Sequence, residues 1–85
     1  MKLNENLIIR EDESGMKLLK NHSIFVIGSD EKIVLNALIE FGDIESAKKY
    51  LRENSFKHIP ASTVDAEVEK FAGQLLREEI IVRTE

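Results

Sequence analysis

The stretch Ser23-Ile24-Phe25-Val26-Ile27-Gly28-Ser29 decides the fold of this chain. Four of its residues in a row are apolar and either β-branched or aromatic, and such residues favour an extended strand. Gly28 ends the strand, and Ser29 is followed by two acidic residues, which is typical of a helix N-terminus, so Ser29 is expected to cap the helix. The stretch therefore predicts a strand that runs directly into a helix.

Two further strands are predicted before this stretch. Residues 7–10 and 16–20 are short apolar runs, and the polar residues 11–15 between them indicate a hairpin loop of about five residues that ends in Gly15. Asn21 and His22 give a second turn. Three short strands with such tight connections predict an antiparallel three-stranded sheet.

Three helices are predicted after the stretch. Apolar residues recur at helical spacing up to Phe41, and Gly42 is expected to end the first helix there. Asp43 follows at once and is expected to cap a second helix, which ends near residue 53. Ser62 or Thr63 is expected to cap the third and longest helix, which runs to about residue 78 and carries an apolar stripe.

The predicted architecture is an α+β fold of winged-helix type, with a three-stranded antiparallel sheet followed by three helices in the order βββααα. Almost no linker joins the first two helices, as in a helix-turn-helix. Residues 54–61 form a linker before the third helix, and the apolar tail 80–82 is expected to dock back on the domain. A chain of 85 residues is expected to form one domain, spanning residues 1–85.

The composition limits the classes of function. The chain is 42% hydrophobic and 33% charged, carries a net charge of −4 and contains no cysteine. The lack of cysteine removes disulfides, thiolate metal ligands and cysteine nucleophiles, and it fits a cytoplasmic protein. No apolar run approaches the roughly 20 residues that span a membrane, and the N-terminus does not resemble a signal peptide.

The sequence contains none of the common catalytic or metal-binding motifs. His22 and His58 stand alone, without the spacing of a metal site. The serines lack a nucleophile elbow, and Gly28-Ser29 lacks the other residues of a phosphate-binding loop. We therefore expect a protein that is not an enzyme and that has no metal and no cofactor.

The strand 23–27 and the third helix together indicate a groove for an extended peptide. An edge strand offers unpaired N–H and C=O groups that a peptide strand satisfies, while side-chain pockets give selectivity. One alternate pair of residues 24–27 is expected to face the core and the other the groove; the sequence leaves open which pair does so, and also that all four belong to the core. The candidate peptide-binding residues are Ile24, Phe25, Val26 and Ile27 on the strand, and Val64, Glu67, Val68, Lys70, Phe71 and Gln74 on the helix.

Several stretches resemble the PqqD family of precursor-peptide recognition elements. They are the hairpin around residues 11–15, the strand that runs into a helix, the junction Phe41-Gly42-Asp43-Ile44 and the segment 68–76, with Glu67 where the family often has Asp. Two positions depart from the family. Ile27-Gly28-Ser29 stands where a Leu-Asn pair usually follows the third strand, and Glu79 stands where a Gly usually follows the last helix.

The resemblance implies a specific function. Members of the PqqD family are not enzymes; they bind the leader segment of a ribosomally made precursor peptide and present it to a modifying enzyme, often a radical-SAM protein, or to a leader peptidase. The leader adds as a strand beside the third strand and lies against the third helix. The candidate residues on that strand and that helix would then contact the leader.

Two other classes of protein stay open. In a winged-helix DNA-binding protein the third helix would enter the major groove. Residues 62–79 carry five acidic and two basic side chains, and phosphates repel the resulting net charge of −3. Lys48, Lys49 and Arg52 on the second helix are the one basic cluster available for contacts to a nucleic-acid backbone. The other class is a generic protein-interaction module.

Overall fold

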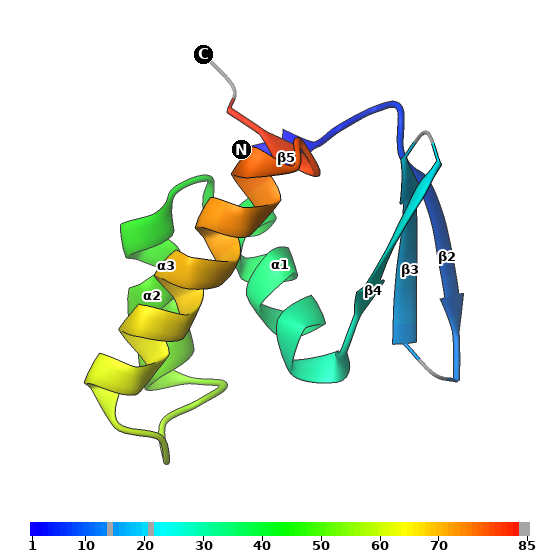
Figure 1. Ribbon diagram of the computed structural model, residues 1–85. Helices are drawn as coiled ribbons and strands as arrows, with labels where there is room; N and C mark the ends of the chain where they lie inside the picture. Colours follow the sequence, from blue (N-terminus) through cyan, green and yellow to red (C-terminus); the bar gives the residue numbers. More distant parts are fainter. Residues whose placement is uncertain (14, 21, 84–85) are drawn as a thin grey trace.

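Residues 1–13, 15–20 and 22–83 are described by a computed structural model, and they form an α+β fold with a three-stranded antiparallel sheet and three helices (Figure 1). All three helices lie on the same side of the sheet (Figure 1). The sheet has the strand order β2-β3-β4, so β4 lies at an edge. The elements are β2 (Ile8–Asp12), β3 (Gly15–Lys20), β4 (Ser23–Ile27), α1 (Ser29–Phe41), α2 (Ile44–Glu53) and α3 (Ala61–Arg77).

Two short strands at the ends of the chain add to the predicted order. β1 (Lys2–Leu3) pairs antiparallel with β5 (Ile81–Val82), so the order βββααα is incomplete. The expected docking of the apolar tail is confirmed, because Ile80 and Ile81 are both only 1% exposed. A strand of two residues is too short to give an alternating pattern, and for that reason the sequence did not reveal this pair.

The sheet has one covered face and one exposed face. Met16 and Leu18 of β3 are buried, and their cross-strand partners in β4 are Ile27 and Phe25. Since side chains alternate between the two faces of a strand, Ile24 and Val26 lie on the opposite face, where they are 63% and 62% exposed. The possibility that all four apolar residues of β4 belong to the core is therefore wrong; the inward pair is Phe25 and Ile27.

The first hairpin is tighter than predicted. β2 begins at Ile8 and reaches Asp12, whose partner is Gly15, so positions 13 and 14 alone remain between the strands in place of a five-residue loop. β2 is exposed along its whole length, which allows the polar residues Glu11 and Asp12 to continue the ladder. Asn21, part of the predicted second turn, lies outside the described residues, as does Ser14.

Two of the predicted helix caps are wrong. Gly28 is the N-cap residue of α1, and its N–H donates to the Glu31 carboxylate at 3.1 Å, so Ser29 already belongs to the helix. Pro60 occupies the N-cap position of α3, where its carbonyl accepts from Val64 N–H at 3.1 Å. The helix therefore starts earlier than Ser62 or Thr63, because proline needs no N–H partner and its fixed φ suits a helix start.

The junction between α1 and α2 is as predicted. Gly42 is left-handed, with φ of 77°, and its N–H donates to the carbonyl of Leu38 at 3.0 Å. Asp43 caps α2 by accepting a hydrogen bond from Ser46 N–H at 2.8 Å. The backbone and side-chain hydrogen bonds from Ser46 hold the pKa of Asp43 below its usual value, since they favour the ionised carboxylate.

The end of α3 is a Schellman turn with an unusual residue. Ile80 N–H donates to the carbonyl of Leu75 at 2.9 Å, and Glu79 N–H donates to the carbonyl of Leu76 at 3.1 Å. Glu79 has a φ of 58°, a conformation that normally selects glycine. Buried Ile80 and Leu75 form the hydrophobic pair that accompanies this turn, so β5 follows α3 without further linker.

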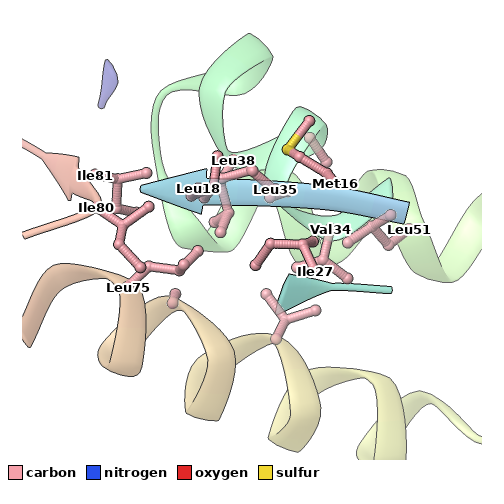
Figure 2. Close-up of a cluster of buried hydrophobic side chains, with 14 of the residues drawn as sticks. Met16, Leu18, Ile27, Val34, Leu35, Leu38, Leu51, Leu75, Ile80 and Ile81 are labelled. Carbon is pink, nitrogen blue, oxygen red and sulfur yellow. The ribbon is translucent and has the colours of Figure 1, made fainter. Parts of the chain in front are cut away.

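The core lies between the covered face of the sheet and the helices. Figure 2 shows Leu18 from β3 among side chains that come from α1, α3 and the tail. Burying a side chain of this size contributes about 1.5–3 kcal/mol. The largest fully buried residues are Leu18, Leu35, Leu38, Leu51, Val68, Leu75, Ile80 and Ile81.

Substituting two glycines tests this packing. A Cβ at Gly15 would lie 2.7 Å from the backbone oxygen of Ile27, and the φ of 126° there is already unfavourable for any other residue. Gly15→Ala is therefore expected to lower the free energy of unfolding by about 1–3 kcal/mol. Gly73 lies within α3, and a Cβ added there would have nothing within 4 Å. Gly73→Ala should therefore raise the free energy of unfolding by about 0.5–1 kcal/mol. Urea unfolding measures both, and an equal effect of the two substitutions would contradict the hairpin geometry.

Candidate functional site

The edge of β4 is open on the side of α3. Among the described residues no strand pairs with the outer edge of β4, since its one partner in the sheet is β3. α3 contributes Phe71, Gln74 and Leu75 to a hollow that borders this edge. Unpaired main-chain groups next to apolar side chains are the two components that an added peptide strand requires.

Two neighbouring hollows form a groove along α3. The first, here named the strand hollow, has a volume of about 230 Å³ and is lined by residues 24–27 together with Glu31, Phe71, Gln74, Leu75 and Ile80. The second, the helix hollow, has a volume of about 380 Å³ and lies between the start of α1, the segment 56–59 and α3. Glu31, Phe71 and Gln74 line both hollows, so the two adjoin each other. Together they are called the groove.

All ten residues predicted from the sequence line this groove. Ile24, Phe25, Val26 and Ile27 line the strand hollow, although the side chains of Ile24 and Val26 lie on the exposed face of the sheet, away from the helices. The six predicted residues of α3 line the helix hollow. Their burial differs in a consistent way. Val64 and Val68 are buried in the floor, Phe71 is half-buried, and Glu67, Lys70 and Gln74 are exposed at the rim.

The sequence did not indicate the residues that close the far end of the groove. Asp30, Glu31 and Val34 from the first turns of α1 line the helix hollow, as do Phe56 and Ile59 from the segment before α3. In the sequence, the carboxylates of Asp30 and Glu31 indicate the N-terminus of a helix and nothing more. The predicted strand that runs directly into a helix does imply that α1 contributes to the groove. A connection of one residue places the first turn of the helix at the end of the strand.

Ion pairs between α2 and α3 hold one wall of the groove in place. Lys48 Nζ, on a side chain that is 7% exposed, donates to Glu69 at 2.7 Å and to Glu45 at 3.1 Å. Arg52 contacts both carboxylate oxygens of Asp65, at 2.8 and 3.0 Å. The hydrogen bond to Glu69 raises the pKa of Lys48, even though burial acts against the charged form.

These ion pairs involve most of the basic cluster on α2, which the sequence left available for contacts to a nucleic-acid backbone. Two of its three members, Lys48 and Arg52, neutralise acidic residues of α3. Lys49 is exposed and has no ion pair among the described residues. The cluster therefore stabilises the packing of α2 on α3. Lys49 is the one member of the cluster that remains to contact an external anion such as a phosphate.

No group of three or more His, Cys, Asp or Glu side chains in residues 1–13, 15–20 and 22–83 is placed to hold a metal ion. Within the same ranges, none of the helices has the length and apolar character needed to cross a membrane. Comparisons of the chain with protein-family models, with curated proteins and with solved structures found no match.

The pH dependence of unfolding tests the Lys48 ion pairs. The pKa of Lys48 is raised in the folded state, so its contribution is fully present below the unfolded value near 10.5 and is lost as the pH rises through the folded value. Lys48→Met is expected to be less stable than the parent protein at pH 8, and the difference should shrink at pH 11.5.

The matched control is Lys49→Met, which removes the neighbouring exposed cation. Its effect on the free energy of unfolding should be small and should not change between the two pH values. A difference between Lys48→Met and the parent protein that stays constant from pH 8 to pH 11.5 in urea unfolding would contradict the role given to Lys48.

Proposed function

We propose that this chain is a non-catalytic cytoplasmic carrier, which captures the leader segment of a ribosomally made precursor peptide as a strand added along β4 and presents it to a modifying enzyme. That enzyme is of the radical-SAM type or is a leader peptidase. The single observation that carries the proposal is the open edge of β4, which borders the groove against α3.

The geometry supports strand addition for a physical reason. A peptide beside β4 gains main-chain hydrogen bonds at every second residue, and it satisfies groups that otherwise stay unpaired at the edge. Its alternate side chains point toward α3, where Phe71 lines both hollows and Val64 and Val68 form the apolar floor of the helix hollow. Main-chain bonds then supply affinity, while the hollows select among sequences.

The resemblance to the PqqD family supports the same proposal. In the winged-helix arrangement that the resemblance implies, the leader lies between the third strand and the third helix, and these correspond to β4 and α3. Glu79, where the family usually has Gly, adopts the left-handed conformation that glycine favours. The glutamate at this position therefore keeps the left-handed backbone conformation that a glycine would allow.

A generic protein-interaction module is the second candidate function. One observation favours it, since the exposed face of the sheet carries Ile8, Ile24 and Val26, each more than half exposed. Apolar patches of this kind often mark contacts between proteins. The two candidates share Ile24 and Val26 of β4 but differ in the use of α3, because residues of α3 line the groove and the exposed face of the sheet lies away from the helices.

Amide-shift mapping tests the proposal. We expect a peptide, selected from a random dodecapeptide library on the immobilised chain, to shift the amide signals of β4 and α3. N-methylation at those alternate peptide positions that face β4 should abolish binding, and methylation at the intervening positions should not, because strand addition uses every second N–H. Shifts on Ile8, Leu19 and the rest of the exposed face that spare α3 would favour the generic interaction module.

Phe71 and Phe41 provide a matched pair of variants for the same peptide. Phe71 lines both hollows, so Phe71→Ala should weaken binding roughly tenfold to a hundredfold, the effect of losing a large apolar contact. Phe41 packs on Tyr50 at a ring distance of 4.9 Å and lines neither hollow, so Phe41→Ala should leave affinity unchanged. Fluorescence anisotropy measures both, and equal affinities would exclude the groove as the binding site.

DNA binding is expected to be absent at physiological salt. α3 is acidic, and the ion pairs to Glu69 and Asp65 occupy two of the three cations on α2. A gel-shift titration with duplex DNA in 150 mM salt should give no dissociation constant tighter than about 10⁻⁶ M, the limit of ordinary non-specific binding. A tighter, salt-sensitive complex would overturn the carrier proposal in favour of a winged-helix DNA-binding protein.

A further inference from the structure

The helix hollow has the features of a pocket for one large apolar side chain. Its volume of about 380 Å³ lies within the range of ligand pockets, and its floor contains Val64, Val68 and Phe71. Phe56 and Ile59 close it from the side of the segment before α3. An aromatic or leucine side chain from an extended peptide would bury its apolar surface there.

The rim of the helix hollow is acidic. Asp30, Glu31 and Glu67 face a single cation, Lys70, so the rim carries a net charge of −2. Glu31 accepts a hydrogen bond from Gly28 N–H. Asp30 and Glu67 are exposed and have no ion pair among the described residues.

The acidic residues of α3 fall into two groups that differ in their partners. Asp65 and Glu69, on the side toward α2, are both neutralised by cations of the same chain. Glu67, on the side of the groove, has no such partner in the described part of the chain. The unbalanced negative charge of α3 is therefore placed where a bound peptide would meet it.

We propose, on the basis of the strand capture argued above, that the peptide carries a Lys or Arg within two positions of a large apolar residue. The apolar side chain enters the helix hollow, and the cation lies over Asp30 and Glu67 at the rim. Residues i and i+2 of a strand point to the same side about 6.8 Å apart, so both contacts are within reach of one extended segment. The occupant of this end of the groove is thus a basic and apolar peptide segment.

A phage-displayed library of random dodecapeptides, selected on the immobilised chain, tests the proposal. Three proteins are compared. They are the parent chain, the double variant Asp30→Asn/Glu67→Lys, which changes the rim from −2 to +1, and the control Glu40→Gln/Glu53→Lys, which makes the same change of net charge outside the groove. Circular dichroism establishes that all three are folded.

The parent chain and the control should select peptides in which Lys or Arg is enriched within two positions of a large apolar residue. The groove variant should lose this preference. A basic peptide selected on the parent chain should bind the groove variant about fivefold more weakly at 50 mM salt, and the difference should narrow at 0.5 M salt, because screening weakens contacts between exposed charges.

The remaining outcomes separate the two proposals. If the parent chain selects apolar peptides without any basic preference, or if the groove variant keeps the preference of the parent, the charge proposal falls and strand capture stands. If the control loses the preference, the cation binds outside the groove and the charge proposal also falls. If none of the three proteins enriches any peptide, strand capture itself is wrong and the charge proposal falls with it.

Discussion

A single residue, Gly28, connects the last strand of the sheet to the first helix, and this short connection constrains the rest of the structure. Ile27 is buried in the core and Ser29 already belongs to α1, so the chain passes from the sheet to the helices through one residue. This connection is called the Gly28 corner. The Glu31 carboxylate holds the N–H of Gly28, and Gly15 lies so close to the Ile27 carbonyl that a side chain would not fit. The corner places the first turn of α1 at the end of the open edge of β4, and it thereby creates the helix hollow.

The second wall of the groove depends on how α3 distributes its residues around its axis. One face contributes buried apolar side chains to the core, such as Val68 and Leu75. A second face carries Asp65 and Glu69, which bind Arg52 and Lys48 of α2. The third face borders the groove and combines apolar Phe71 with exposed polar residues. An acidic helix is thus stable in this chain because its charge is partly neutralised from within, and the remainder lies along the groove.

The sequence predicted the parts of this structure that have a clear periodicity. The strand 23–27, the apolar stripe of α3 and the junction at Gly42 and Asp43 all follow from spacing and from residues with strong local preferences. The caps predicted at Ser29 and at Ser62 or Thr63 are wrong because Gly28 and Pro60 come first in the chain and suit a helix start equally well. The pairing of β1 with β5 joins the two ends of the described chain, and two-residue strands leave no pattern. The contribution of α1 to the groove is a tertiary effect of the Gly28 corner, which no local preference encodes.

The position of β4 at the edge of the sheet determines the surface that a complex with a captured peptide would present. A strand has two sides for hydrogen bonding, and a captured peptide would use one of them on β4. The peptide would then itself be the outermost strand of a four-stranded sheet, with its other side still unsatisfied. Its outward side chains would continue the exposed face that Ile24 and Val26 begin. If β4 captures a peptide as proposed, the complex would thus present a surface made jointly by both chains, and a modifying enzyme would distinguish the complex from the empty protein by shape alone, without any conformational change in the protein.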